Sequence, residues 1–248
     1  MDTPAIEVRF LNVAYRSGKK ARQAVRVLSF QVREGEIVGF IGPNGAGKTS
    51  TIKALLGFIP SPHGTCFISG VACTDPQSRR DLGYMPEISY YPKYLTLSEF
   101  LHACAAVSGV PRKQRGEAVL SAARRVGMEE HLRSRLSGFS KGMLQQAGCA
   151  QALVHNPRTL ILDEPMSGLD PIARMRMRRL LSELRDEGKT ILFSSHELSE
   201  IEMVADRIIL MDKGELVFQG SVAEVATGEG NLEKAFLHLL GEELPWAA

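Results

Sequence analysis

The chain has 248 residues and 44% hydrophobic content, enough to bury a substantial core, as one large domain or as one core with a small attached subdomain. Its 30 basic and 28 acidic residues leave a formal net charge of +2, too balanced to indicate nucleic-acid binding through bulk electrostatics. No apolar run approaches the roughly 18 residues that a membrane-spanning helix needs, and no signal peptide is visible. We expect a soluble globular protein without a membrane span of its own.

The N-terminal part of the sequence predicts strands, followed by a strand, a turn and a helix. Apolar and polar residues alternate from Ile6 to Val32, as in antiparallel strands that bury one face. The continuous apolar run at residues 36–41 is typical of a strand buried on both faces. It leads through a glycine-rich turn into residues 48–58, which we predict to be helical.

The stretch from about Thr96 to Leu153 changes character and becomes helical. Thr96 followed by Glu99 forms a capping-box pattern, and Gly127 stands where a helix would end. This pattern predicts a small helical insertion that interrupts an α/β core.

Beyond the insertion the sequence returns to alternating strands and helices. Strand, helix and strand in this order imply a parallel sheet with right-handed crossovers. The predicted elements are strands at 159–162 and 190–194, a helix at 172–187 between them, and a terminal hairpin of 207–211 and 215–218 about Lys213 and Gly214.

A phosphate-binding loop is predicted between the buried strand at 36–41 and the helix after it. Glycines let backbone N–H groups wrap around phosphates, and the helix N-terminus adds its positive dipole end. Lys48 would reach the β- and γ-phosphates, and Thr49 would ligate Mg²⁺. The motif indicates a purine nucleoside triphosphate, but alone it does not separate ATPase, GTPase and kinase. The residues that fit the pattern G-x-x-x-x-G-K-[ST] are Gly42, Pro43, Asn44, Gly45, Ala46, Gly47, Lys48 and Thr49, with Ser50 as a further nucleotide contact.

Two adjacent acids, Asp163 and Glu164, follow the predicted strand at 159–162. In a parallel sheet the carboxyl end of that strand lies at the same edge as the glycine-rich loop. Asp163 is suited to hold Mg²⁺ through water, and Glu164 to polarise an attacking water for in-line displacement. By itself the pair would also fit a solvated turn. Together with the phosphate loop it indicates hydrolysis rather than transfer to a second substrate.

A third segment places small polar residues at the start of a helix within the insertion. Residues 136–146 read LSGFSKGMLQQ, with Ser140 and Gly142 where the first N–H groups of a helix form an anion site. This segment resembles the signature motif of the ATP-binding cassette (ABC) ATPases. As in that family, it is followed by an Asn-Pro pair at 156–157 and then by the acidic strand.

The resemblance covers nearly the whole chain, and its motifs fall in the family's order. It implies an α/β fold of the P-loop NTPase (RecA-like) class, with a parallel-sheet core, an N-terminal antiparallel β-subdomain and a helical signature subdomain. The matching residues are the adenine-stacking aromatic Tyr15; the phosphate loop; the signature Ser140, Lys141, Gly142 and Met143; the metal-binding and catalytic Asp163 and Glu164; the dimer-seam loop Ser167, Gly168, Leu169 and Asp170; and the switch histidine His196.

The resemblance also implies how such a protein works. In that family the signature of one subunit closes on the nucleotide held by the phosphate loop of the other, so that two ATP molecules with Mg²⁺ lie between two subunits. ATP binding would close the dimer, and hydrolysis would reopen it. Glu164 and His196 are the implied catalytic residues, with His196 holding the attacking water or sensing the γ-phosphate.

Two positions depart from the family's usual pattern. Glu87 stands where a glutamine usually contacts Mg²⁺, and a carboxylate there can still reach the metal but adds negative charge beside the phosphates. Lys141 stands where the common signature has glycine. Its ammonium should attract the γ-phosphate, although it could equally point to solvent.

We expect one ABC nucleotide-binding domain over residues 1–248. The C-terminal apolar stripe is most simply a small helix that packs on the core. The predicted parts are a β-subdomain at about 1–35 and 60–75, an ATPase core at 36–58 and 155–220, a helical subdomain at 88–154, and a C-terminal extension at 221–248 with the stripe Leu232, Phe236, Leu239 and Leu240.

The expected function is ATP hydrolysis that powers translocation by a separate transmembrane permease subunit at the cytoplasmic face of the membrane. The two departures, Tyr91-Pro92 and the C-terminal stripe resemble the ABC-2-type exporter branch, which implies export. Residues 88–92 are a plausible groove wall for a helix of that partner. The second nucleotide-binding subunit could be an identical or a different cassette, and the cargo would be selected by the permease.

Two other classes of function compete with transport. A soluble non-transport ABC ATPase acting on nucleic acid or ribosomes would more often carry a second cassette, a coiled-coil insertion or a strongly basic face. The interval 87–140 has no sustained heptads, and we expect no nucleic-acid partner. A nucleotide-binding regulator without turnover is disfavoured because Glu164 and His196 are both present. The one basic run, which is most simply a solvated helix face, is Arg174, Arg176, Arg178 and Arg179.

Overall fold

The computed structural model describes residues 3–17, 20–59, 63–87, 90–229 and 232–240. The chain forms two compact units, a first unit of Met1–Arg79 with Leu192–Ala248 and a second unit of Arg80–Ile191. Some predictions fall partly outside the described residues: the β-subdomain at 1–2, 18–19 and 60–62, the groove wall at Ile88 and Ser89, and the C-terminal extension at 230–231 and 241–248.

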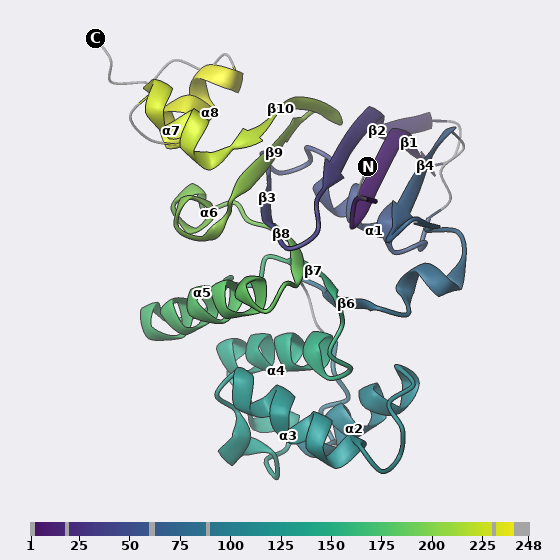
Figure 1. Ribbon diagram of the computed structural model, residues 1–248, viewed down its shortest axis with the longest axis vertical. Coiled ribbons are helices and arrows are strands. Elements are labelled where there is room, and N and C mark those ends of the chain that lie inside the picture. The colour runs from purple at the N-terminus through teal and green to yellow at the C-terminus, as the bar shows by residue number, and fades with distance from the viewer. Residues whose placement is uncertain (1–2, 18–19, 60–62, 88–89, 230–231, 241–248) are drawn as a thin grey trace. The chain divides into compact units, whose positions relative to one another are not determined.

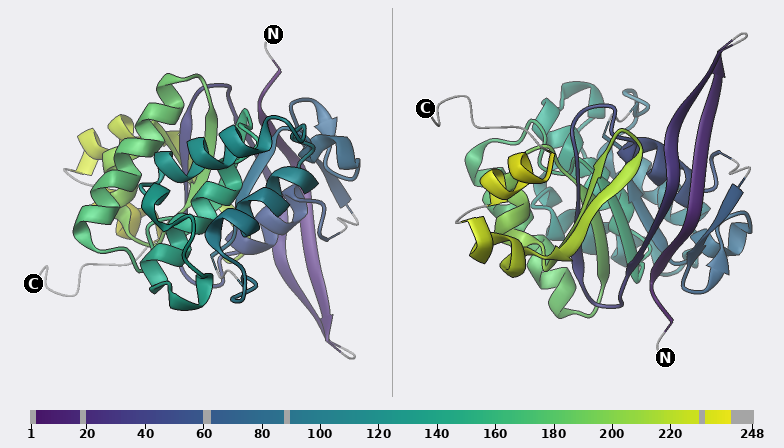
Figure 2. Two further views of the ribbon diagram at one scale, coloured as in Figure 1. Left: turned by 90° about the horizontal axis from the view of Figure 1, so that it is seen from below. Right: turned by 90° about the horizontal axis from the view of Figure 1, so that it is seen from above.

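The first unit contains an antiparallel sheet in which β1 pairs with both β2 and β4. The long pair β1 and β2 runs side by side in Figure 2. The predicted alternation is confirmed where Ile6, Val8, Val25 and Val32 are buried. It is wrong at Phe10 and Val27, which are 66% and 62% exposed, because both take a left-handed φ where the strand is irregular and their side chains turn outward. In the order β2-β1-β4-β5, the strands are β1 (Ile6–Ser17), β2 (Lys20–Val32), β4 (His63–Ile68) and β5 (Val71–Ala72).

The same unit holds part of the predicted parallel sheet. There β3 (Ile37–Ile41), buried along its whole length, pairs in parallel with β9 (Arg207–Asp212). β10 (Glu215–Ser221) returns antiparallel to β9. The predicted turn between them is confirmed: Lys213 and Gly214 have φ of 46° and 88°, which suits a tight hairpin.

Helices complete the first unit. The helix α1 (Lys48–Leu55) is shorter than the predicted 48–58, because Gly57 takes a left-handed φ of 70° and ends it. The C-terminal stripe lies on α8, where Leu232 is buried but Leu239 is 37% exposed. The remaining elements are α6 (Leu198–Val204), α7 (Val222–Glu229), α8 (Leu232–Leu240) and a 3₁₀ turn at Pro76–Arg79.

The second unit is mainly helical, with a parallel strand pair. Its strands β6 and β7 pair in parallel, and α2, α3 and α4 pack together (Figure 1). β8 (Thr190–Ser194) leads from this unit into the first. The elements are β6 (Leu82–Met85), α2 (Leu97–Val107), α3 (Arg115–Arg125), α4 (Lys141–Leu153), β7 (Thr159–Asp163) and α5 (Pro171–Asp186), with 3₁₀ turns at Glu129–His131 and Leu136–Gly138.

The helix boundaries of the second unit follow the predicted signals. Thr96 caps α2 by accepting from the Glu99 N–H at 3.2 Å, while the Glu99 carboxylate accepts from the Thr96 N–H at 2.8 Å. Gly127 follows α3 with a left-handed φ of 72°. Both signals are local to the chain, which is why the sequence alone reveals them.

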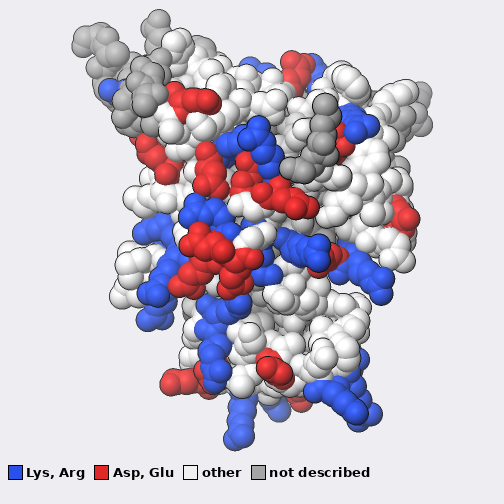
Figure 3. Space-filling model, viewed as in Figure 1, with Lys and Arg blue, Asp and Glu red and all other residues white. Residues whose placement is uncertain are grey.

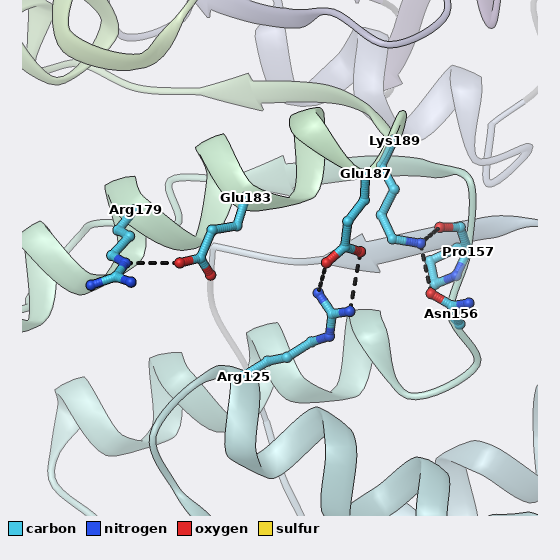
Figure 4. Close-up of polar contacts among 7 residues, drawn as sticks. All are labelled: Arg125, Asn156, Pro157, Arg179, Glu183, Glu187 and Lys189. Atoms are coloured by element: carbon cyan, nitrogen blue, oxygen red, sulfur yellow. Dashed lines mark hydrogen bonds and ion pairs between the residues drawn. The ribbon is translucent and has the colours of Figure 1, made fainter.

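Two polar contacts hold the segments that lead into β7 and β8 (Figure 4). The guanidinium of Arg125, the last residue of α3, donates two hydrogen bonds, at 2.8 and 3.1 Å, to the carboxylate of Glu187. Glu187 directly follows α5. Lys189 is only 8% exposed, and its ammonium donates to the Asn156 side-chain oxygen at 2.7 Å and the Pro157 carbonyl at 2.8 Å. These oxygens replace the water that the buried ammonium loses.

Charge is mixed over the visible surface of the described residues. Lys and Arg lie among Asp and Glu on the face drawn in Figure 3. In the basic run of α5, Arg176 and Arg179 are exposed, and Arg179 pairs with Glu183 at 2.8 Å. Arg174 differs from the expected solvated face, because it is half-buried and donates to the Leu169 carbonyl at 3.1 Å. Among the residues that the structure describes, no helix combines the length and apolar character that a bilayer crossing requires.

Backbone strain in the N-terminal sheet gives a test of this architecture. Val27 has a left-handed φ of 44° although its side chain is β-branched and 62% exposed. Such a conformation costs a non-glycine residue about 1–2 kcal/mol. Val27→Asn should therefore raise the free energy of unfolding by about 1 kcal/mol, measured by urea denaturation.

The matched control is Val27→Ala, which removes the same exposed branch but keeps a residue unsuited to left-handed backbone. The free energy of unfolding should rise less in Val27→Ala than in Val27→Asn. An equal rise in the free energy of unfolding of the two variants would mean that side-chain exposure, and not backbone strain, limits stability at this position.

Candidate functional site

The predicted phosphate loop lies in the first unit between β3 and α1, and its glycines are required by the backbone. Gly42, Gly45 and Gly47 have φ of 151°, 83° and 109°. A Cβ on Gly42 would overlap the carbonyl oxygen of Met211, and one on Gly47 would lie 2.6 Å from that of Ala24. The loop thus packs too closely against neighbouring backbone to accept side chains at Gly42 and Gly47.

Polar side chains lie in and beside the loop. The Lys48 ammonium donates to the carbonyl oxygens of Gly42 and Pro43, the latter at 3.4 Å. Thr49 is exposed. Tyr15, which is 40% exposed, donates its hydroxyl to Ser50 at 3.2 Å. The structure therefore places the hydroxyl of Tyr15 at the start of α1.

The turn of the β9–β10 hairpin supports the loop from behind. The Gly214 N–H donates to the Ala46 carbonyl at 2.9 Å, and the Arg26 N–H donates to the Gly214 carbonyl at 2.7 Å. A Cβ on Gly214 would lie 2.9 Å from the Ala24 carbonyl oxygen. The sequence predicts this turn from its residue types, but it carries no signal that the turn braces the phosphate loop.

His196 follows β8 in the first unit and is exposed. The hydroxyl of the preceding Ser195 accepts from the Glu197 N–H at 3.0 Å and fixes the turn into α6. His196 lines a cavity of about 320 Å³ together with the carboxylates of Glu197, Glu202 and Glu233. The C-terminal helix α8, which carries Glu233, therefore contributes to the surroundings of the predicted switch histidine.

The predicted acids lie at the end of β7 in the second unit. Asp163 and Glu164 are 3% and 9% exposed. Glu164 has a left-handed φ of 53°, unusual for a residue with a side chain. Its carbonyl accepts from the Ser167 N–H at 3.1 Å and from the Gln145 side-chain amide at 2.7 Å. Gln145 lies in the signature segment, yet the sequence gives it no predicted role.

Together with burial, the charges of Asp163 and Glu87 affect the pKa of Tyr84 in the second unit. Burial first, and then the charges of Asp163 and Glu87, raise the pKa of Tyr84 to about 12. Glu87 is exposed. Within the described part of the chain, no cluster of 3 or more His, Cys, Asp or Glu side chains is placed to hold a metal ion on its own. A metal at these acids would need other oxygen ligands as well.

The predicted signature and seam loop touch each other within the second unit. Ser140 caps α4 by accepting from the Met143 N–H at 3.2 Å. A Cβ on Gly168, whose φ is 71°, would lie 2.8 Å from both Cδ and Cε of Lys141. The arm of Lys141 therefore runs over the seam loop. A Cβ on Gly142 would lie 3.6 Å from the Gly168 carbonyl oxygen.

The seam loop ends in the cap of α5. The Asp170 carboxylate accepts from the N–H groups of Ile172 and Ala173, at 2.9 Å each. Leu169 is buried, and its N–H donates to Met166 at 3.3 Å. Because the Ser167 N–H also donates to the Glu164 carbonyl, the loop is tied to the end of β7 and to α5.

The chain is similar to known proteins over almost its whole length. A family profile described as "ABC transporter" matches residues 25–167. The uncharacterized ABC transporter ATP-binding protein all4389 of Nostoc sp. is 38% identical over 251 residues, covering 99% of this chain and 73% of that protein. The linearmycin resistance ATP-binding protein LnrL of Bacillus subtilis is 31% identical over 222 residues, covering 88% of this chain and 70% of that protein.

Solved structures share the fold. One described as the ATP-binding subunit of an ABC transporter has a TM-score of 0.85 and 29% identity, covering 95% of this chain and 99% of that one. A second, the dimeric post-hydrolysis ATP-binding cassette MJ0796 bound to ADP and Pi, has a TM-score of 0.80 over 87% of this chain and 98% of that one. At 21% identity, the second likeness concerns the fold alone.

The contact of Lys141 with Gly168 gives a test by double-mutant cycle. In Gly168→Ala the new Cβ meets the Lys141 arm and takes a left-handed φ, so the free energy of unfolding should fall by about 1–2 kcal/mol. Lys141→Gly removes the arm but not the backbone strain. Because the end of the Lys141 side chain can move aside, Gly168→Ala should then cost less by up to about 0.5 kcal/mol, measured by urea unfolding of the parent and the three variants. Additive losses would contradict the contact.

Proposed function

Because the chain belongs to the ABC transporter family, we propose that it is the ATP-hydrolysing subunit of a transporter and works as a dimer. The observation that carries this proposal is the phosphate loop, in which Gly42 and Gly47 lie against carbonyl oxygens that leave no room for a side chain. The left-handed glycines and the N-terminus of α1 suit a bound triphosphate. The buried acid pair at the end of β7 suits hydrolysis of its terminal phosphate.

Each predicted residue has a role in this proposal. Lys48 binds the β- and γ-phosphates, and its present carbonyl partners show that its ammonium reaches back over the loop. Glu164 polarises the attacking water, and His196 holds that water or senses the γ-phosphate. Tyr15 stacks on the adenine, with its hydroxyl anchored on Ser50.

Thr49 and Asp163 are the proposed ligands of Mg²⁺, with Glu87 as a further contact. A hydroxyl and carboxylates are the hard oxygen donors that Mg²⁺ prefers, and this ion normally keeps waters and substrate phosphates as its other ligands. The lack of a closed cluster of three protein ligands among the described residues is compatible with such a site. When bound, Mg²⁺ neutralises charge that develops on the phosphates.

The dimer completes each nucleotide site in this proposal. Ser140, Lys141, Gly142 and Met143 at the start of α4 bind the nucleotide held by the other subunit, and the loop 167–170 lies at the seam. The dimeric cassette with ADP and Pi supports this arrangement by its likeness in fold. The second subunit is either an identical or a different cassette.

The partner that uses the hydrolysis energy is proposed to be a transmembrane permease, with this chain at the cytoplasmic face of the membrane. In the described part of the predicted groove wall, Tyr91 packs on Phe100 with ring centroids 4.8 Å apart, while Tyr90 is 93% exposed. An aromatic so exposed suits a partner surface. The resistance function in the name of LnrL supports export as the direction of transport.

Substitution of Glu164 tests the catalytic assignment. Glu164→Gln should keep ATP binding and dimerisation while steady-state hydrolysis falls on the order of 10²-fold or more, because the amide cannot act as a base. Lys48→Ala should instead weaken nucleotide binding itself. The control Glu130→Gln makes the same change at an exposed position and should leave hydrolysis unaltered. Normal turnover in Glu164→Gln would remove Glu164 from its role.

Capture of partners tests the transport assignment. Tagged Glu164→Gln protein, held closed by ATP and Mg²⁺, is used to recover partners from gently solubilised cells, and these are identified by mass spectrometry. We expect a multi-spanning membrane protein in near-equal amount. Recovery of ribosomal or DNA-maintenance proteins without a membrane partner would favour the soluble, non-transport alternative.

A further inference from the structure

The side chain of Gln145 is buried against the backbone of Glu164. It lies in the second turn of α4, is 5% exposed, and its amide nitrogen donates to the Glu164 carbonyl oxygen at 2.7 Å. The same oxygen accepts from the Ser167 N–H at 3.1 Å. One carbonyl thus joins the end of β7, the loop after it and the helix that begins at the signature.

The backbone that Gln145 holds is strained. Glu164 has a φ of 53°, a left-handed conformation that a residue with a Cβ avoids. Conformations of this kind persist where the surrounding structure imposes them. The amide of Gln145 is one such restraint, because it fixes the peptide plane that follows Glu164. Without that donor, residue 164 can rotate toward ordinary backbone angles and swing its carboxylate.

We propose that Gln145 is a positioning residue for Glu164. This inference rests on the proposed function, in which Glu164 polarises the attacking water. Displacement of a reacting group by about 1 Å can cost on the order of 10²-fold in rate, so a hydrogen bond that sets the direction of the carboxylate affects turnover more than nucleotide binding.

The position of Gln145 on α4 gives this hydrogen bond a second consequence. Ser140 caps the start of α4, and Gln145 lies on the same helix just beyond it. A rigid helix therefore connects the residues proposed to bind the partner's nucleotide with the base that acts on the chain's own nucleotide. Closure of the dimer on the signature is transmitted to Glu164 through Gln145 in this scheme.

The neighbouring Gln146 provides a matched control. Its amide nitrogen donates to the Val126 carbonyl at 3.0 Å, the same kind of bond from the same helix, but to a segment away from the acids. In Gln145→Leu we expect kcat for ATP hydrolysis to fall about 10- to 100-fold, with KM for ATP changed less than about 2-fold. In Gln146→Leu we expect kcat to change less than about 2-fold, at a similar loss of thermal stability.

A second variant separates the hydrogen bond from simple packing. In Gln145→Glu the new carboxyl can donate to the Glu164 carbonyl only when it is protonated, and burial raises the pKa of such a group. Turnover relative to the parent protein should therefore recover at least about 3-fold as the pH is lowered from about 8 to about 6. A packing role would give the same relative activity at both pH values.

Three results would overturn the assignment: unchanged kcat in Gln145→Leu, an equal fall in the Gln146→Leu control, or a pH-independent deficit in Gln145→Glu. If Gln145→Leu does not fold, the pH dependence of Gln145→Glu decides. Glu164→Gln is measured in parallel. Normal ATP hydrolysis in Glu164→Gln would refute the proposed function itself. Loss of ATP hydrolysis in Glu164→Gln, together with normal hydrolysis in Gln145→Leu, would refute only the role of Gln145.

Discussion

The close approach of backbone carbonyls to the phosphate loop is the constraint on which the first unit depends. The carbonyl oxygens of Met211 and Ala24 lie where a Cβ of Gly42 or Gly47 would stand. Met211 belongs to β9, and Ala24 to β2, so a strand from each sheet of the first unit borders the loop. The loop geometry is therefore fixed by tertiary packing as well as by its own glycines.

Three helix starts near the proposed chemistry differ in how their N–H groups are satisfied. At α1 the capping position is Gly47, which supplies no side-chain acceptor, so the first turn is open to an anion. At α4 the uncharged hydroxyl of Ser140 accepts from the Met143 N–H. At α5 the Asp170 carboxylate accepts from two N–H groups, which closes that start to phosphate. The three helix starts therefore differ in their ability to bind an anion because their capping residues are Gly, Ser and Asp.

Signals that lie close together in the sequence predict much of this protein. The capping box at Thr96, the helix end at Gly127 and the hairpin turn at Lys213 are local, and each is confirmed. The predicted end of α1 at residue 58 is too late, because the helical pattern of the sequence continues past Gly57, which ends the helix with a left-handed φ. Bonds between distant segments leave no such pattern: neither Gln145 on Glu164 nor Gly214 on Ala46 has a signal of its own.

The bracing of the phosphate loop by Gly214 changes what kind of variation the β9–β10 hairpin tolerates. Exposed turns commonly accept inserted residues and even inserted domains. Here Gly214 of the turn donates to Ala46 of the phosphate loop and accepts from Arg26 of β2. An insertion in the turn would therefore remove both hydrogen bonds at once. Natural length variation should therefore avoid this hairpin, and a reporter placed there would disturb the nucleotide site that it was meant to observe.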